Sequence, residues 1–231
     1  MKLLAVETAT EACSAALYYD GAIIERHQIA PQQHTRLILP MIESILAEAG
    51  VPQKDLDALA YGCGPGSFTG VRIATGIIQG IGFGLDLPIV PVSTLAALAQ
   101  DFFDQHDADT AFVAMDARMS EIFWGVYQRN PDNHAELFGK EVVTPAHLIE
   151  FPALNGSGVG SGWGVYADVL GGCLTGQIGT CHPDYLPRAA AVAKLGVYGF
   201  NHGLAVTVDD ALPSYLRNNV AKKNRNGCGL D

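Results

Sequence analysis

A glycine-rich stretch, G-C-G-P-G-S-F-T-G-V-R over residues 62–72, has the composition of a loop that could bind an anion. Its glycines allow a tight turn and a close approach of the backbone to a neighbour. Ser67 or Thr69 could cap the helix that the following apolar residues predict. Free amides at a helix start attract phosphate groups, but a capped turn that only lets a strand and a helix pack closely would use the same residues. Both interpretations stand.

The stretch lacks further residues that two well-known loops require. A P-loop places Lys and then Ser or Thr after its last glycine, whereas Val71 and Arg72 stand there. A nucleophile elbow has glycines two positions before and two positions after its serine. Around Ser67 those positions hold Pro65 and Thr69. The stretch therefore matches neither loop.

Two acidic residues occupy equivalent places in a repeated pattern. Glu7 follows a predicted buried strand, and Asp116 follows a similar strand later in the chain. Each acid is succeeded by a polar turn and by a second strand that ends in tyrosine, so that residues 113–129 match residues 4–20. We interpret the repeat as an internal duplication.

A duplicated pattern of hairpin, acid and helices resembles the actin/sugar-kinase/Hsp70-like (ASKHA, RNase H-like) architecture. In that architecture two related halves close around ATP, and the turns after the acids approach the phosphates. Close approach of backbone amides favours small residues, but the turns read E-T-A-T at 7–10 and D-A-R-M at 116–119. We therefore expect Glu7, Thr8, Asp116 and Arg118 to be degenerate phosphate-loop positions, although the Arg118 guanidinium could itself contact a phosphate.

The residues after the glycine-rich stretch predict a helix with one bare face. Gly76, Gly80 and Gly84 are spaced four apart and share one side of that helix. Each glycine destabilises a helix interior by roughly 1 kcal/mol relative to alanine. A close approach by another backbone, within the fold or from a second protein, would offset that cost. We assign Arg72 to the same contact surface.

A second helix is predicted between about residues 33 and 49, with Pro40 either kinking it or marking its true start. Its apolar residues cover more than one face, which is typical of a helix buried on two sides. We therefore assign Leu37, Met41 and Ile45 to a partner interface.

The composition indicates a compact protein of one large or two modest domains, because 48% of the 231 residues are hydrophobic and 16% are charged. The polar segment at 104–109 is the best candidate boundary. We expect a first half of residues 1–104 together with a tail at about 212–231, and a second half of residues 105–211. The predicted fold class is α/β, and each half contains a mixed β-sheet flanked by helices.

The charge balance and the cysteines narrow the function further. A formal charge of −10 opposes the binding of nucleic acid over a broad surface of this chain alone. Five widely spaced cysteines favour reduced thiols. Glu7 interrupts the first apolar run too early for a signal peptide, and we expect no membrane segment and a cytoplasmic location. Cys181-His182 could be half of a metal site, but such a pair is more often incidental.

Motifs along most of the chain resemble those of the bacterial TsaB (YeaZ) family. They are A-V-E-T-A-T-E-A-C-S-A-A-L at 5–17, H-T-R-L-I-L-P at 34–40, A-Y-G-C-G-P-G-S-F-T-G-V-R-I at 60–73, P-V-S-T-L at 91–95, M-D-A-R-M-S-E-I-F-W at 115–124 and Y-L-R-N-N-V-A at 215–221. The resemblance implies a role in making N6-threonylcarbamoyladenosine at position 37 of tRNAs that read ANN codons. TsaB-like proteins are the non-catalytic members of that set.

The same resemblance implies the partners. It predicts pairing with a related catalytic subunit, TsaD, an assembly that the ATPase TsaE joins, self-association, and contact with tRNA only through the complex. It also implies that ATP and metal belong to the partner subunits and that this chain alone binds no cofactor tightly.

One comparison between the two related families bears on catalysis. TsaD-like proteins bind metal through H-x-x-x-H, and Thr94 and Leu98 occupy the equivalent positions here. Since leucine cannot ligate a metal, we expect no catalytic metal site at this place. The alternative is an ATP-dependent or metallopeptidase-like enzyme of the ASKHA superfamily.

Overall fold

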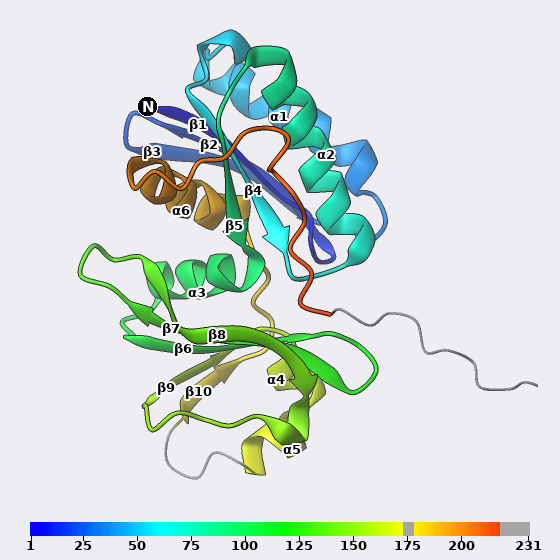
Figure 1. Ribbon diagram of the computed structural model, residues 1–231, viewed down its shortest axis with the longest axis vertical. Coiled ribbons are helices and arrows are strands. Elements are labelled where there is room, and N and C mark those ends of the chain that lie inside the picture. The colour runs from blue at the N-terminus through cyan, green and yellow to red at the C-terminus, as the bar shows by residue number, and fades with distance from the viewer. Residues whose placement is uncertain (173–177, 218–231) are drawn as a thin grey trace, which may run out of the picture.

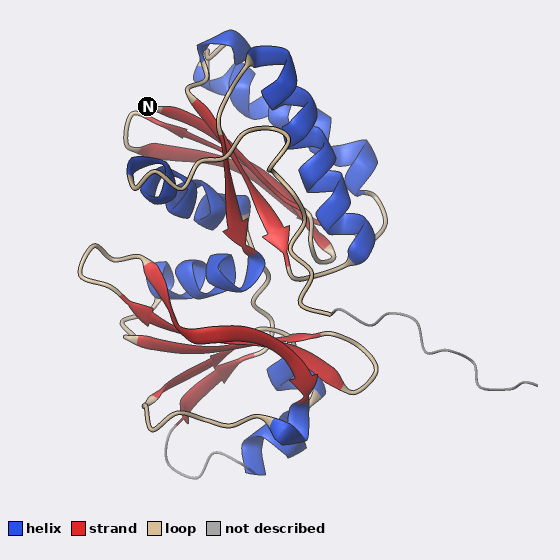
Figure 2. Ribbon diagram, viewed as in Figure 1, coloured by secondary structure: helices blue, strands red, loops and turns tan. Residues whose placement is uncertain are grey.

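Two five-stranded β-sheets form the two halves of the protein, as Figures 1 and 2 show. This computed structural model describes residues 1–172 and 178–217. The first sheet contains β1 (Lys2–Glu7), β2 (Ala12–Tyr19), β3 (Ala22–Ile29), β4 (Ala58–Gly64) and β5 (Ile89–Ser93). The second sheet contains β6 (Thr110–Asp116), β7 (Glu121–Arg129), β8 (Ala135–Pro145), β9 (Gly156–Val159) and β10 (Ile178–His182).

The two sheets have the same strand order. It is β3-β2-β1-β4-β5 in the first sheet and, read in the corresponding direction, β8-β7-β6-β9-β10 in the second. In each sheet the first three strands are antiparallel, and the last two run parallel to the central strand. Glu7 and Asp116 end the two central strands, β1 and β6. The common topology confirms the predicted α/β fold with two mixed sheets and supports an internal duplication.

Helices cover both faces of the first sheet. α1 (His34–Ala49) and α2 (Phe68–Leu85) pack on one face, and α6 (Ala189–Asn201) packs on the other. Side chains alternate along β1, so that Leu4 contributes to the first of these interfaces and Leu3 to the second. A strand that is covered on both faces reads as a continuous apolar run, which explains the sequence of β1.

The second sheet is also sandwiched between helices. α3 (Thr94–Gln105) packs on one face, and the short helices α4 (Gly162–Val165) and α5 (Ala167–Gly172) lie on the other. α3 and α6 lie next to each other between the two sheets (Figure 1). Two single turns of 3-10 helix, Gln53–Asp55 and Ala146–Leu148, complete the regular elements of the described residues.

The division of the chain differs from the predicted one at α6. From the sequence we predict that residues 189–211 belong to the second half, whereas α6 covers the first sheet through contacts with Leu3, Ala5 and Ala60. The chain therefore returns to the first half at about Arg188. The physical reason is that the face of the first sheet opposite to α1 and α2 is apolar and needs a helix to cover it. Residues 218–231 of the predicted tail lie outside the described residues.

The ends of α1 and α2 follow the capping rules. Gly50 ends α1 in the left-handed conformation, with φ 64°, where glycine is favoured. α1 begins at His34 and includes Pro40, so the proline does not mark its start. Ser67, one of the two predicted caps, begins α2, and its side chain accepts a hydrogen bond from the Gly70 amide.

α2 is the one helix among the described residues whose length and composition would suit a membrane span, with a mean hydropathy of 1.2 over 18 residues. Its apolar character has a structural origin. Ala74 and Ile78 face the first sheet within the core, while glycines occupy much of the opposite side. Only 33% of the helix is buried.

Candidate functional site

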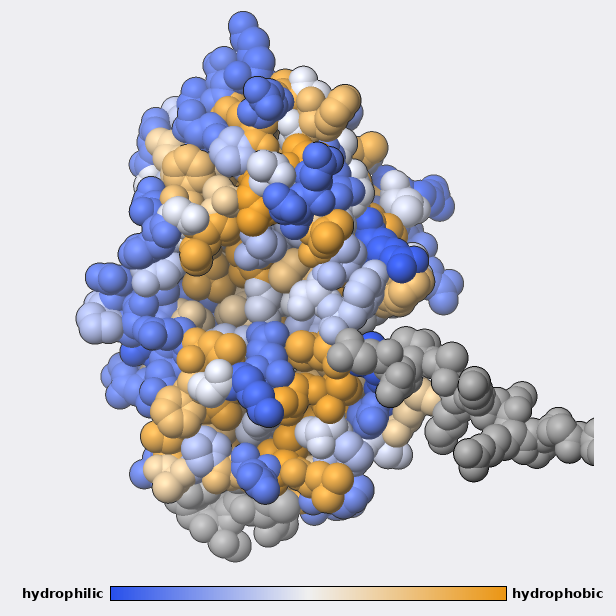
Figure 3. Space-filling model, in the orientation of Figure 1, coloured by the Kyte–Doolittle hydropathy of each residue, from blue (hydrophilic) through white to orange (hydrophobic). Residues whose placement is uncertain are grey.

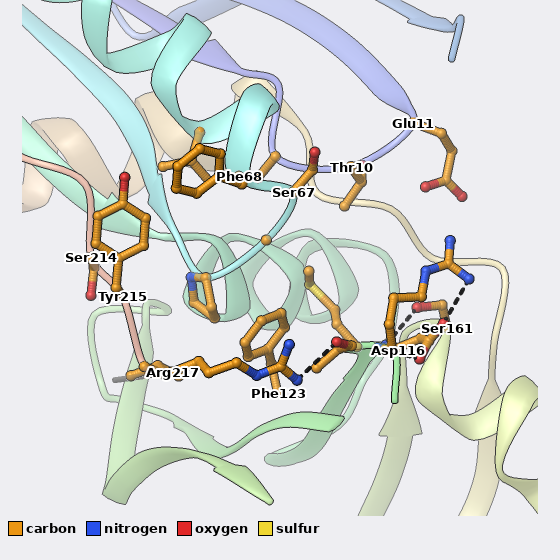
Figure 4. A pocket seen from close by; sticks show the side chains of 18 of the residues that line it. Thr10, Glu11, Ser67, Phe68, Asp116, Phe123, Ser161, Ser214, Tyr215 and Arg217 are labelled. Carbon is orange, nitrogen blue, oxygen red and sulfur yellow. Dashed lines mark hydrogen bonds and ion pairs between the residues drawn. The ribbon is translucent and has the colours of Figure 1, made fainter. Parts of the chain in front are cut away.

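A cleft of about 700 Å³ opens between the two halves (Figure 4). The first half contributes the turn after β1 and the start of α2, and the second half contributes the turn after β6. The chain segment that follows α6 closes one side. Its lining includes Thr10, Glu11, Ser67, Phe68, Asp116, Arg118, Phe123, Ser161, Val165, Tyr215 and Arg217. Thus the cleft lies where the duplicated acids end their strands.

The glycines of the 62–72 stretch serve packing against the turn after β1. A Cβ atom at Gly70 would lie 2.0 Å from the Thr8 carbonyl oxygen, and one at Gly66 would lie 2.6 Å from the Ala9 carbonyl oxygen. The Ser67 amide donates to the Ala9 oxygen at 2.7 Å, and the Thr8 hydroxyl donates to the Gly70 oxygen at 2.7 Å. These contacts support the packing interpretation of the stretch over anion binding.

Glu7 points into the core and does not line the cleft. It is 1% exposed, and its Oε2 atom fills the space where a Gly62 side chain would stand, 1.8 Å from the Cβ position. The Ala9 amide donates to Oε1 at 2.5 Å, and the Thr94 hydroxyl donates to Oε2 at 3.4 Å. Burial raises the pKa of Glu7 to about 7, and these hydrogen bonds only partly oppose the shift. Thr8, also predicted as a phosphate-loop position, is fully buried as well.

Asp116 and Arg118 do line the cleft, and they contact each other. The Arg118 amide donates to Asp116 Oδ1 at 2.8 Å, and the guanidinium lies 3.0 Å from Oδ2. Tyr166 donates a further hydrogen bond to Oδ1 at 2.9 Å. Arg118, Met119 and Ser120 have φ values of 62°, 58° and 62°. Such a run without glycine is a strained backbone, so its neighbours must hold the β6–β7 turn in place.

The positions that the resemblance equates with metal ligands belong to the core. Thr94 and Leu98 are both fully buried, and Leu98 packs with Phe102 and Val113 under the second sheet. Among residues 1–172 and 178–217, no group of three or more His, Cys, Asp or Glu side chains is arranged to hold a metal ion. His182 instead shares a hydrogen bond with Thr180 at 3.0 Å.

The glycine face of α2 is open to solvent. A Cβ atom at Gly76, Gly80 or Gly84 would have no atom of the described residues within 4 Å, its own helix backbone aside. Phe83, on the same outer side, is 82% exposed. No described part of the chain therefore packs against this face, and an approach by another molecule remains.

The predicted α1 residues divide into two groups. Leu37 and Met41 are half-buried against the core, but Ile45 is fully buried and its assignment to an interface is wrong. Ile45 belongs to the stripe formed with Ile38 and Ile42, whose spacing marks the core face of a helix. The heptad-like spacing of these isoleucines could have revealed this from the sequence.

Several apolar residues on α1 and at the cleft are exposed to solvent, and no sequence pattern indicates them. Leu39 of α1 is 50% exposed, while Phe68 and Tyr215, which lie together at the cleft, are 58% and 46% exposed. Arg72 stacks over Phe68, with its guanidinium carbon 3.6 Å from the ring centroid. On the face shown in Figure 3, hydrophilic residues concentrate along the left margin and apolar residues toward the middle of both halves.

Known proteins resemble this chain over nearly its whole length. A family model described as TsaD, tRNA N6-adenosine threonylcarbamoyltransferase, matches residues 23–225. The tRNA threonylcarbamoyladenosine biosynthesis protein TsaB of Escherichia coli is 41% identical over 233 residues, covering 98% of this chain and 99% of that protein. The TsaB protein of Haemophilus influenzae is 38% identical over 236 residues, with 98% of each chain covered.

A solved structure, YeaZ from Pseudomonas aeruginosa, has a TM-score of 0.87 and 39% sequence identity, and the match covers 93% of this chain and 99% of that one. A second structure from that organism, a protein similar to peptidase YeaZ, has a TM-score of 0.88 and covers 94% of this chain. The likeness therefore extends over both halves and the cleft between them.

Proposed function

Because the chain belongs to the TsaB (YeaZ) family, within the wider family that the TsaD model describes, we propose that it is a non-catalytic subunit in threonylcarbamoyladenosine synthesis. Its role is to bind and activate a TsaD-like catalytic subunit that makes N6-threonylcarbamoyladenosine at position 37 of tRNAs reading ANN codons. The names of its relatives assign those proteins to the same biosynthesis.

The open glycine face of α2 carries this proposal. Because Gly76 and Gly80 have no side chain, and no atom of residues 1–172 or 178–217 outside α2 lies within 4 Å of their Cβ positions, a partner helix can approach the α2 backbone closely. The exposed Phe83 adds apolar surface to α2, and the half-buried Leu37 and Met41 belong to α1, which packs beside α2 on the same face of the first sheet. We call these residues, together with Arg72 and Gly84, the docking face.

The burial of the residues at the expected metal and phosphate positions favours a supporting role over catalysis. Thr94 and Leu98 are core residues, and the Glu7 carboxyl is enclosed by Gly62, Ala9 and Thr94. In this proposal ATP and metal are bound by the partner subunits, and this chain alone binds neither tightly. A TsaE-like ATPase joins the assembly, and tRNA is contacted through the complex because the chain carries a charge of −10.

The proposal extends to self-association and location. A second copy of the chain would use the docking face in the absence of the catalytic subunit, so the two partners would compete. The assembly would act in the cytoplasm, without membrane contact.

Reconstitution tests the proposed function directly. The chain is co-purified with a TsaD-like subunit, and tRNA modification is assayed with and without it. We expect a stable complex and modification that depends on this chain. Full modification by the TsaD-like subunit alone would contradict the proposal.

Gly80→Leu should weaken pairing with the TsaD-like subunit at least tenfold, which corresponds to roughly 1.4 kcal/mol or more. The leucine side chain would project into the space that the partner backbone needs, while the monomer has nothing within 4 Å to oppose it. Titration of the partner by light scattering or calorimetry measures the loss, and urea unfolding checks the fold.

Gly171→Leu is the matched control for that variant. Gly171 is also a helical glycine with nothing within 4 Å of its Cβ position, but it belongs to α5 in the second half. Equal affinities of the two variants for the partner would show that the docking face lies elsewhere.

The second candidate function is an ATP-dependent or metallopeptidase-like enzyme, and the cleft of about 700 Å³ favours it. Asp116, Arg118 and Ser161 are the polar groups there that could meet a nucleotide. Calorimetry of the isolated chain with Mg-ATP separates the two functions. Tight binding or turnover would favour the enzyme, whereas the absence of heat would favour the supporting subunit.

A further inference from the structure

The segment 212–217 crosses from the first half of the protein to the second. Its start is tied to β4, because Tyr61 donates to the Leu212 oxygen at 2.9 Å and the Ser214 amide donates to the Cys63 oxygen at 2.7 Å. Both Tyr215 and Arg217 line the cleft, as Figure 4 shows. We call this segment the strap.

Tyr215 connects the strap to α2. Its hydroxyl accepts a hydrogen bond of 2.9 Å from Nε of Arg72, and its ring lies 6.1 Å from that of Phe68. The Arg72 guanidinium stacks on Phe68, so the three side chains form one unit. Arg72 precedes Gly76 by one helical turn and lies on the same side, at the edge of the docking face.

Two residues later, Arg217 connects the strap to the second half. Its Nη2 atom donates to the Ala117 carbonyl oxygen at 3.0 Å and forms an ion pair with Glu121. Ala117 and Glu121 flank the three consecutive residues with positive φ in the β6–β7 turn. Since that turn is strained, contacts from outside help to keep it in place.

We propose that the strap couples the docking face to the β6–β7 turn. A partner that covers Arg72 then also steadies the turn and restricts the movement of the two sides of the cleft relative to each other. This inference rests on the proposed function, because the partner is the subunit that docks on α2. Covering the Arg72, Phe68 and Tyr215 unit removes water from it, which strengthens both the cation–π contact and the hydrogen bond. The tightened Tyr215 then holds Arg217 on the turn, and by reciprocity a steadied turn favours docking.

Amide hydrogen exchange of residues 116–121 in the isolated chain tests the coupling. Tyr215→Phe removes the hydroxyl that accepts from Arg72, and Arg72→Gln removes the stacked cation. Each variant should speed exchange in the turn roughly fivefold, the effect of losing about one hydrogen bond. The contact that each variant removes lies on the first half, whereas the turn belongs to the second half. Arg36→Gln, at an exposed site on α1, is the matched control and should leave the turn unchanged.

Arg217→Gln shows that the measurement responds to the strap, because this variant loosens the turn directly. If Arg217→Gln speeds exchange while Tyr215→Phe and Arg72→Gln do not, the coupling is overturned. The isolated chain gives this result without any partner, so it is independent of whether the proposed function is correct.

A second measurement adds the TsaD-like subunit. Docking should slow exchange at residues 116–121 in the wild-type protein and have no such effect in Arg217→Gln. Slowing of equal size in both proteins would mean that docking reaches the turn by another route and would overturn the role of the strap. Failure of the subunits to pair would count against the proposed function, while the isolated-chain result would still decide the coupling.

Discussion

Gly70→Ala should lower the free energy of unfolding by roughly 3 kcal/mol, the upper range for forcing extra atoms into a packed interior. The new Cβ atom would lie 2.0 Å from the Thr8 carbonyl oxygen and 3.0 Å from its carbon. Both atoms belong to backbone, so no flexible side chain can move aside. Any shift would also disturb the hydrogen bond from the Thr8 hydroxyl to the Gly70 oxygen.

Urea unfolding of the wild type and the variant measures this difference. Gly76→Ala is the matched control, because it makes the same change six residues later in α2 at a site with nothing within 4 Å. It should raise stability by up to about 1 kcal/mol, through the better helix propensity of alanine. Equal effects of the two substitutions would refute the packing role of Gly70.

Glu7→Gln should stabilise the protein by roughly 3 kcal/mol above pH 7 and have little effect at low pH, because a difference of one in pKa between folded and unfolded chains corresponds to about 1.4 kcal/mol. The pKa of Glu7 rises from 4.5 to about 7 because the folded protein buries the carboxyl. Below pH 4.5 both folded and unfolded chains hold the proton, so ionisation makes no difference to stability. Between pH 4.5 and 7 the unfolded chain loses its proton first, and stability falls as the pH rises.

The glutamine suits the site, because its amide oxygen can still accept from the Ala9 amide while its amide nitrogen faces the Thr94 hydroxyl. Denaturant unfolding across this pH range gives the profile for each protein. Glu11→Gln, at an exposed residue of the cleft, controls for the loss of one negative charge. If Glu7→Gln follows the same profile as the wild type, the buried carboxyl does not govern this pH dependence.

Local patterns in the sequence were sufficient for much of the fold. Ser67 caps α2, as predicted. Asp-Gly is a typical hairpin turn and glycine a typical helix end, and Asp20-Gly21 joins β2 to β3 while Gly50 ends α1. The repeat around Glu7 and Asp116 predicted two related halves. These features depend on neighbours in the chain, and residue type and periodicity report such neighbours well.

Features that depend on distant contacts were not accessible in the same way. The purpose of Gly70 is visible only once Thr8 is known to lie against it, 62 residues earlier in the chain. The strap is equally hidden, because Tyr215 and Arg217 have no pattern that points to Arg72 or Glu121. Nor does any local signal show that α6 covers the first sheet. For Glu7, the duplicated pattern suggested a place at the phosphates, whereas Gly62 makes room for it in the core.

The position of α6 has a consequence for synthesis on the ribosome. The first sheet begins with the first strand to emerge, yet the helix that covers Leu3, Ala5 and Ala60 is made only after the whole second sheet. Although α3 contributes Ala96 and Ala97 to the same apolar cluster, the part of that face that lies under α6 stays uncovered until residues 189–201 leave the exit tunnel. The half of the protein that is translated first is therefore completed last. Until then the growing chain exposes apolar surface of the kind that chaperones bind.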